Sequence, residues 1–513
     1  MLVRWFGWML MAAALAAPGD FGYVSGPPHV FCIAYAHGKR SQRARRGQER
    51  RRRPPPAEKG RGRVKHRRVF VVLGLIGTIA LVAALSIVAG GTAGTKAQAR
   101  AGVAAAVAPP KVPNAAAIKK KYRGQRITFI GDNIGLTHQR DLKLVARFQR
   151  DTGIKVNLIA HPAQSTDAYA QLARNFSSHS SSVDVAMLDV VWPGAFAPYL
   201  VNLKPALGKA AKQHAQSIVQ SDTIGGKLVA MPWFGDYGIL YYRTDLLSKY
   251  GYSKPPTTWQ ELGRMAKKIQ DGERKSNANF YGFVWQGNAY EGLTCDALEW
   301  IASSGGGHFI DNGKASINNP KAIAILNTVR GWVGNIAPRG VTTYQETQAL
   351  NAFDAGDAAF MRNWPYAYSV SQTTGIKGKF GVTVLPHGKG GHSVGTVGGW
   401  QLAVSKFSKH KGAAIELVRY LTSPAVQKFD AIFASNVPTI PKVASNKAVV
   451  KVNPWLKPAI ANVPRVTRPS KFLKAKYQQG STIIFQGINR IENGADAKSV
   501  VPGIASQLNR LLK

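Results

Sequence analysis

The stretch that decides the fold is residues 125–160, which read QRITFIGDNIGLTHQRDLKLVARFQRDTGIKVNLIA. An apolar run at 127–130 predicts a strand, and a Gly/Asp/Asn turn follows it. The next segment predicts an amphipathic helix, because apolar residues recur there at helical spacing, namely Leu142, Leu144, Val145 and Phe148. A second apolar run at 155–159 predicts another strand. This alternation of strand and helix is typical of an α/β fold.

The same rhythm continues along the chain. A helix is predicted at 167–176, a buried strand at 183–188, and further strands at 226–230 and 239–242. Helix starts are marked by a capping box at 258–261 and by Ser423-Pro424. We therefore expect a mostly parallel sheet with helices on both faces. About 390 residues of this pattern exceed one typical core, so we expect two α/β lobes with a ligand cleft between them.

Length and composition set the outer limits. The chain has 513 residues, which predicts two or three domains, and 45% hydrophobic residues with 11 Trp exclude a wholly disordered protein. The two cysteines, Cys32 and Cys295, exclude a disulfide scaffold and any cysteine-rich metal module.

The N-terminal region differs in composition from the rest. Residues 39–68 hold 15 Lys/Arg and two acids, a net charge of +13, so we expect residues 1–68 to be a disordered basic tail. Residues 69–91 carry no charge and would form about 33 Å of helix, enough to cross a bilayer core of about 30 Å. This segment is either a transmembrane anchor with its basic flank in the cytoplasm or a signal segment that is cleaved near 97–99.

Two further expectations concern the flanks of the apolar segment. Residues 1–38 also look signal-like, and a mis-called start codon is the plainer interpretation of two export-like segments in tandem. Residues 92–124 are rich in Ala, Pro and Lys and predict a linker. The chain beyond it is expected outside the cytoplasm, either anchored to the membrane through residues 69–91 or secreted.

The net charge of +42 first suggests a nucleic-acid partner. However, residues 92–513 carry a net charge of +29 that is spread in ones and twos, without an aromatic-interleaved stripe. We interpret this as a solvated surface adapted to an anionic envelope, and we expect no nucleic-acid partner.

Enzyme signatures are missing. Residues 388–392 are glycine-rich but lack the strand–turn–helix setting of a phosphate loop, and no Gly-x-Ser-x-Gly elbow occurs. No two histidines have the spacing that places two metal ligands on one helix face. Asp184 and Asp189 lie on one predicted strand, but their offset places them on opposite faces. We therefore expect a protein that is not an enzyme, with no catalytic residues, no metal and no cofactor.

Aromatic residues and polar groups occur together at four predicted strand ends, at 188–192, 232–237, 362–366 and 398–401. A neutral sugar packs its C–H face on an aromatic ring, and its hydroxyls bond to carboxylate, guanidinium or amide groups. Any one of these tryptophans could equally be a core residue. Together, the four segments favour a carbohydrate site.

At these residues the chain resembles the extracellular solute-binding proteins of carbohydrate ABC transporters, and most closely the trehalose/maltose-binding members. The similarity covers roughly residues 125–513. Its most specific stretches are LDVVWPGAFAPY at 188–199, 238–269, YGFVWQGNAYEG at 281–292, AAFMRNWPY at 358–366 and GGWQLAVSK at 398–406.

The resemblance implies a periplasmic-binding-protein-like fold of class II, with two α/β lobes, a hinge and an interlobe cleft. It places the first lobe at about 125–232 and 383–433 and the second at about 236–382 and 440–513. The implied ligand-binding residues are Asp189, Asp236, Trp364, Gly399, Trp400 and Arg465. Further candidates from the same segments are Trp192, Trp233, Phe234, Tyr290 and Glu291.

Two departures from the relatives bear on the ligand. Where they carry an acid after the first strand and turn, this chain has residues 135–139, so that acceptor is missing or is replaced by Thr137 or Gln139. A ligand-facing tyrosine appears here as Phe234, which removes one hydroxyl. Another α-glucoside or small oligosaccharide is therefore an alternative to trehalose.

The resemblance implies the sugar-binding component of an ABC importer. It would capture a small oligosaccharide, such as the disaccharide trehalose or maltose, and deliver it to the permease subunits in the membrane. Two alternatives remain open, a membrane-tethered sugar sensor with the same fold and a glycoside hydrolase that uses Asp189 and Asp236.

Overall fold

The computed structural model describes residues 107–513 except residue 462. The predicted basic tail 1–68, the apolar segment 69–91 and the first part of the linker lie outside the described residues. Within the part of the chain that the structure describes, none of the helices has the length and apolar character needed to cross a membrane.

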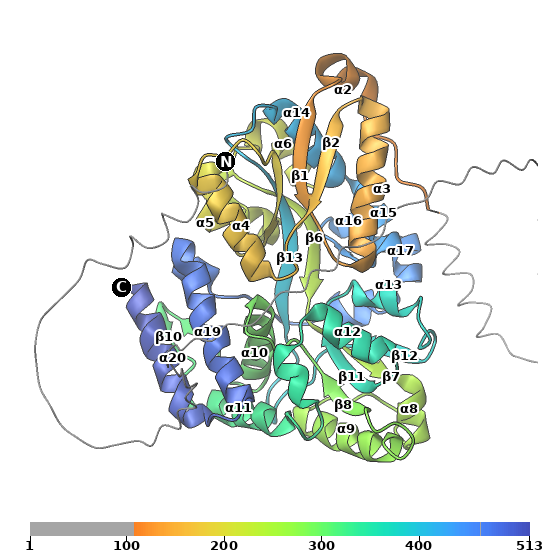
Figure 1. Cartoon of the computed structure of the whole chain (residues 1–513), viewed down its shortest axis with the longest axis vertical. Coiled ribbons are helices and arrows are strands. Elements are labelled where there is room, and N and C mark those ends of the chain that lie inside the picture. Colours follow the sequence, from red (N-terminus) through yellow and green to blue (C-terminus); the bar gives the residue numbers. More distant parts are fainter. Residues whose placement is uncertain (1–106, 462) are drawn as a thin grey trace, which may run out of the picture. The chain divides into compact units, whose positions relative to one another are not determined.

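The first lobe, the upper body in Figure 1, is built on a seven-stranded sheet. Six strands follow the order β14 (Val437–Pro438), β6 (Met231–Tyr237), β13 (Gly395–Val404), β3 (Val185–Asp189), β1 (Arg126–Gly131) and β2 (Lys155–Ala160), and β15 (Arg465–Val466) pairs with β13. β1 is parallel to β2 and β3, whereas β13 is antiparallel to β3 and β6. The prediction of a mostly parallel sheet is wrong here, because β13 returns from the second lobe and runs against its neighbours.

Strand β3 shows why the sequence of a strand in this sheet is apolar at successive positions. Val185 and Met187 belong to a core that includes residues of α3 (Gly135–Thr152), α14 (Lys411–Leu421) and α15 (Pro424–Phe433). The alternate residues Ala186 and Leu188 belong to the core that includes α4 (Ser165–Ser177). Both faces of the sheet are covered, so successive residues of either orientation must be apolar.

One residue of the predicted helix in the opening stretch departs from expectation. Leu144 and Phe148 of α3 are fully buried, but the side chain of Leu142 is 51% exposed. Two residues correspond to about 200° around a helix, so Leu142 lies on the face opposite Leu144.

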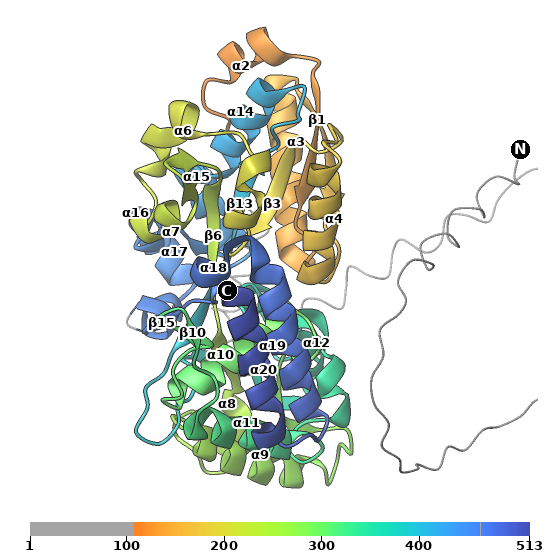
Figure 2. The same cartoon turned by 90° about the vertical axis from the view of Figure 1, so that its left-hand side faces the viewer.

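The second lobe contains a four-stranded sheet in the order β12 (Phe380–Thr383), β7 (Ile239–Arg243), β11 (Ala358–Asn363) and β8 (Tyr281–Val284). Its longer helices are α9 (Trp259–Glu273), α10 (Glu291–Ser303), α11 (Pro320–Trp332), α12 (Glu346–Asp354), α19 (Tyr477–Glu492) and α20 (Ala497–Leu512). Figure 2 shows α19 and α20 side by side against this lobe, close to α10. The predicted capping box of α9 is confirmed, with Thr258 and Glu261 each bonding the other's backbone.

The remaining elements are short. They are α5 (Pro193–Phe196), η1 (Ala197–Tyr199), α6 (Lys204–Ala211), α7 (Gln216–Ser221), β4 (Thr223–Ile224), β5 (Lys227–Leu228), α8 (Thr244–Lys249), β9 (Ile310–Asp311), β10 (Lys314–Ala315), η2 (Arg339–Thr343), α13 (Ala367–Ser371), α16 (Pro441–Ala444), α17 (Lys447–Val452), η3 (Lys457–Ala461), α18 (Ser470–Leu473) and η4 (Lys474–Lys476).

The end of the predicted linker 92–124 is folded onto the first lobe. Residues Ala115–Tyr122 form helix α2, and Ile118 and Val112 are buried in the core that α3 shares. The backbone nitrogen of Val112 donates to the carboxylate of Asp151 at 3.0 Å. Composition alone missed this helix, because only one residue within it, Ile118, is buried.

Two long strands connect the lobes. The chain leaves β6 through Gly238 directly into β7 of the second lobe, and β13 returns to the first-lobe sheet. Both strands cross the waist of the molecule in Figure 1. The predicted architecture of two α/β lobes is confirmed.

Candidate functional site

A cavity lies at the waist between the two sheets. Its enclosed volume is about 80 Å³, and about 630 Å³ of space between protein atoms surrounds it when the part open to solvent is included. The chemistry-bearing residues of its lining are Asp132, Thr137, His161, Asp189, Phe234, Asp236, Glu291, Cys295, Glu346, Trp364, Tyr366, Trp400, Asn436 and Arg468, together with the backbone of Gly292, Gly398 and Gly399.

Strand pairing brings three of the predicted segments together. In the antiparallel pair of β13 and β3, Trp400 is the register partner of Asp189. On the other side of β13, Trp400 is paired with Phe234 and Gly398 with Asp236. Neighbouring strands lie about 4.8 Å apart, so two carboxylates and one indole from distant parts of the chain reach the same end of the sheet.

Gly399 is required by the close approach of β13 to β6. Its φ is +114°, a conformation that L side chains rarely adopt, and a Cβ there would lie 2.6 Å from the carbonyl oxygen of Phe234. The carbonyl oxygen of Gly399 accepts a hydrogen bond from the backbone nitrogen of Val190 at 3.0 Å. The backbone at Gly399 therefore lies against the cavity without a side chain in the way.

The indole of Trp400 is held from two sides. Its ring stacks on His161 with centroids 5.2 Å apart, and the ring of Trp192 meets it edge-on at 5.7 Å and 88°. Trp192 is only 1% exposed and does not line the cavity, whereas Trp400 is half-buried. Trp192 thus supports the ring of Trp400 from behind.

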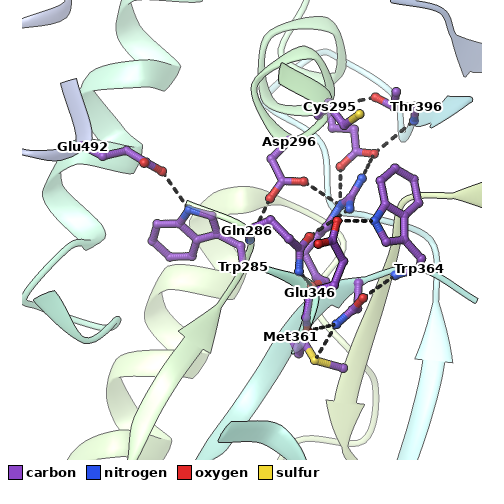
Figure 3. A network of polar contacts seen from close by, with 12 residues as sticks. Trp285, Gln286, Cys295, Asp296, Glu346, Met361, Trp364, Thr396 and Glu492 are labelled. Carbon is purple, nitrogen blue, oxygen red and sulfur yellow. Dashed lines mark hydrogen bonds and ion pairs between the residues drawn. The ribbon is translucent and has the colours of Figure 1, made fainter. Parts of the chain in front are cut away.

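The indole of Trp364 comes from the second lobe. The guanidinium carbon of Arg362 lies 3.9 Å from its ring centroid, and its Nε1 donates to Oε1 of Glu346 at 3.2 Å. Figure 3 shows Trp364 beside Glu346 in a larger network of polar contacts. One face of the ring is thereby occupied by a cation, and the indole also lines the cavity.

Arg362 is the centre of that network. It donates to both carboxylate oxygens of Glu299, at 2.9 and 2.6 Å, and its Nε lies 2.9 Å from Oδ1 of Asp296. Glu299 also accepts from the backbone nitrogen of Thr396 on β13 at 3.1 Å. A Cβ on Gly238 would lie 1.8 Å from Oε1 of Glu299. The ion pair therefore packs against both strands that connect the lobes.

The carboxyl group of Asp236 is buried with few contacts that would stabilise its negative charge. Its Oδ1 is buried and forms no hydrogen bond within the described residues. Burial raises the pKa of Asp236 well above its ordinary value, and the charges of Asp132, Asp430 and Asp189 raise it further. A ligand hydroxyl that donates to this oxygen would supply the missing hydrogen bond and so remove the free-energy cost of leaving the oxygen unpaired.

Arg468 connects the two lobes across the cavity. It donates to both oxygens of Asp189 and, at 2.7 Å, to Oε1 of Glu291 at the start of α10. Glu291 also accepts from the hydroxyls of Tyr477 and Ser481. Burial raises the pKa of Glu291, while Arg468 acts to lower it. The Nε atom of Arg468 is buried without a partner in the described part of the chain.

The structure places the predicted residues in two groups. Asp189, Asp236, Trp364, Gly399 and Trp400 line the cavity, and so do Phe234, Glu291 and Thr137. The others do not line it, namely Trp192, Trp233, Tyr290, Gln139 and Arg465.

Arg465 points elsewhere. It is exposed, and its guanidinium carbon lies 4.7 Å from the ring centroid of Tyr237, whereas Arg468, three residues on, is 3% exposed and lines the cavity. Trp233 is 1% exposed and packs 4.1 Å from the guanidinium of Arg140.

Sequence reasoning missed several lining residues, namely Asp132, His161, Glu346, Tyr366, Asn436 and Arg468. Asp132 had a usable signal, because it follows β1 directly at the same sheet edge as Asp189. His161 had the same signal, because it follows β2 directly, and Tyr366 lies in the segment 362–366 noted above. Glu346, Asn436 and Arg468 carry no such signal, since a helix start and loops bring them in.

No group of three or more His, Cys, Asp or Glu suited to a metal ion occurs among residues 107–513 apart from residue 462. Cys295 is a free, buried thiol.

Comparisons with known proteins agree with this geometry. Residues 138–428 match the family model described as bacterial extracellular solute-binding protein. A protein of Deinococcus radiodurans named probable ABC transporter-binding protein is 48% identical over 362 residues, which cover 69% of this chain and 86% of the relative.

Solved structures are similar as well. The maltose-bound structure of T. maritima MalE3 is 37% identical and aligns with a TM-score of 0.71 over 76% of this chain and 100% of that one. An ABC transporter solute-binding protein of Agrobacterium radiobacter K84 in complex with ribitol is 25% identical, with a TM-score of 0.64 over 76% of this chain and 99% of that one.

Proposed function

Because the chain belongs to the family of bacterial extracellular solute-binding proteins, and is the extracytoplasmic solute-binding component of an ABC transporter, we propose that its solute is a neutral disaccharide such as trehalose or maltose. The proteins it matches are binding proteins, so it is a binding protein and not an enzyme.

The charge of the cavity lining carries this proposal. Among the described residues, five carboxyl groups line it, those of Asp132, Asp189, Asp236, Glu291 and Glu346, and Arg468 is the one Lys or Arg of its lining. That arginine is already engaged by Asp189 and Glu291. A phosphorylated or acidic solute would meet these carboxyl groups without a free cation to balance them, whereas sugar hydroxyls donate to such groups.

The aromatic groups support a sugar-sized ligand. Trp400 from the first lobe and Trp364 from the second both line the cavity, and neighbouring side chains pack against each ring. Pyranose rings bury their C–H faces on such surfaces. A ligand that uses both indoles contacts both lobes, as a disaccharide would.

Phe234 bears on which sugar the cavity binds. Its ring lines the cavity but has no hydroxyl to bond with the ligand, so one contact that the resemblance implies is absent. Among candidates we therefore include α-glucosides other than trehalose. The T. maritima relative is maltose-bound, which is consistent with this class of ligand.

Capture would depend on the two lobes. A ligand that contacts both lobes stabilises the state in which they are close, and this state would be the one that docks on the permease. Residues 69–91 would supply either the anchor or the export signal, and N-terminal sequencing of the mature protein from membrane and soluble fractions distinguishes the two.

Isothermal titration of residues 92–513 against trehalose, maltose, glucose 6-phosphate and glutamate tests the proposal. We expect binding of at least one disaccharide and no binding of the two anions. The matching ligand should also stabilise the fold by about 2–3 kcal/mol at a hundredfold excess over Kd. Binding of an anion with no response to any neutral sugar would overturn the proposal.

A further inference from the structure

The first lobe has few exposed negative charges near its N-terminal end. In residues 107–160, Asp132 and Asp141 are buried and Asp151 has a side chain that is 14% exposed. The same segment has nine exposed basic residues, which are Lys111, Lys119, Lys120, Lys121, Arg123, Arg126, Lys143, Arg150 and Lys155. The surface charge of this region is therefore more positive than the residue counts indicate.

Local packing gathers most of these cations at one end of the lobe. Arg126 at the start of β1 is the register partner of Lys155 at the start of β2. Arg123 packs on the turn between α3 and β2, since a Cβ on Gly153 would lie 3.1 Å from its Cγ. We call this surface the basic end, and it comprises Lys119, Lys120, Lys121, Arg123, Arg126, Arg150 and Lys155.

The basic end is remote from the ligand cavity. Helix α2, which carries the three consecutive lysines, lies at the top of the molecule in Figure 1. Strand β1 starts in the basic end with Arg126 and is followed by Asp132, which lines the cavity. Six strand residues span about 20 Å, so ligand binding does not use these cations.

Few acidic side chains of the protein neutralise these positive charges. Within the described residues, Lys119, Lys120, Lys121, Arg123, Arg126 and Lys155 take part in no ion pair. Asp151 lies 3.8 Å from Arg150, but it is also engaged by Arg147 at 2.7 Å and by the backbone nitrogen of Val112. Exposed like charges repel each other, so a negatively charged surface would stabilise them.

We propose that the basic end binds the surface of an anionic lipid bilayer. Helix α2 begins 24 residues after the uncharged segment 69–91, and that connection spans at most about 80 Å when fully extended. If residues 69–91 anchor the chain, this connection limits how far the folded lobes can move from the lipid surface. In the part of the chain that the structure describes, the basic end offers no row of aromatic rings for stacking bases, which a single-stranded nucleic acid would use.

Vesicle co-sedimentation tests the proposal with residues 92–513. The described residues 107–513, residue 462 aside, contain both lobes, and the T. maritima relative aligns along its whole length, so this part folds without the apolar segment. We expect binding to vesicles that contain phosphatidylglycerol, loss of that binding in 0.5 M salt, and none to phosphatidylcholine vesicles.

Matched variants locate the surface. Each lysine that contacts an anionic bilayer strengthens partitioning about fivefold. The triple variant K119Q/K120Q/K121Q should therefore lower vesicle partitioning about 100-fold. The control K267Q/K268Q/K321Q removes three exposed lysines from α9 and α11 of the second lobe and should leave partitioning nearly unchanged. Sugar titration of both variants checks that the fold is intact.

Three results would overturn the proposal: equal binding to both kinds of vesicle, an equal loss in the two variants, or no vesicle binding alongside tight binding of a soluble polyphosphate. Each leaves the proposed sugar binding untouched, because that is measured separately on the same protein.

Discussion

Arg468 contacts Asp189 at two points, with Nη1 2.9 Å from Oδ2 and Nη2 2.6 Å from Oδ1, although 279 residues separate them. The same guanidinium reaches Glu291 at 2.7 Å. Asp189 ends β3 of the first lobe and Glu291 begins α10 of the second. The arginine therefore compensates one carboxylate from each lobe at the cavity.

We expect Arg468→Ala to lower the free energy of unfolding by about 3–5 kcal/mol, because it leaves two buried carboxylates without their cation. Urea denaturation measures this. Arg468→Lys should keep part of the stability but lose the two-point contact and weaken sugar binding. Arg465→Ala is the matched control, since Arg465 is exposed and should change both quantities little. A larger loss of sugar affinity in Arg465→Ala would contradict this placement.

Asp236 should make stability depend on pH. Its folded pKa is raised above the ordinary 3.8, so the folded state binds the proton more tightly than the unfolded chain. The free energy of unfolding therefore falls as pH rises from about 4 toward the raised pKa. Asp236→Asn removes this penalty.

We thus expect Asp236→Asn to match the wild type near pH 4 and to exceed its stability by about 1–3 kcal/mol at pH 8, measured by thermal and urea unfolding at each pH. A difference that is the same at both pH values would refute the argument. Asp236→Ala should weaken sugar binding in the titration, because it removes an acceptor that lines the cavity.

The two indoles should contribute to affinity from opposite lobes. Trp400→Ala and Trp364→Ala should each weaken sugar binding about 10–100-fold by calorimetry, since each removes a buried stacking surface. Trp400→Phe keeps an aromatic face and should retain most of the affinity. Trp192→Phe is the control for the supporting ring, because Trp192 does not line the cavity. Unchanged affinity in both alanine variants would remove the site assignment.

Gly238 tests the link between the strands that connect the lobes and the ion pair of Arg362. A Cβ there would lie 1.8 Å from Glu299 Oε1 and 2.6 Å from Nη2 of Arg362, so Gly238→Ala must displace the pair. We expect a loss of about 1–3 kcal/mol in unfolding free energy together with weaker sugar binding. Gly194→Ala, where the added Cβ meets nothing within 4 Å, should be neutral. Equal stability of the two variants would show that the packing at Gly238 is loose.

Local pattern predicted much of the fold. The apolar runs of β1, β2, β3 and β7 were located within a few residues, and the capping box of α9 was correct. These features depend on neighbours within a few positions in the chain. The direction of β13 was missed, because strand pairing over long sequence separations leaves no periodic signal.

The sequence by itself determined the α/β class, the two lobes, and the segments with acid and aromatic residues that meet at the cavity. It could do so because strand ends and side-chain types are local properties. Only the tertiary structure decided that Arg468 lines the cavity while Arg465 lies over Tyr237, and that Trp192 supports Trp400 from behind. The direction of a long side chain depends on the groups packed around it, and here those groups come from segments more than 150 residues away.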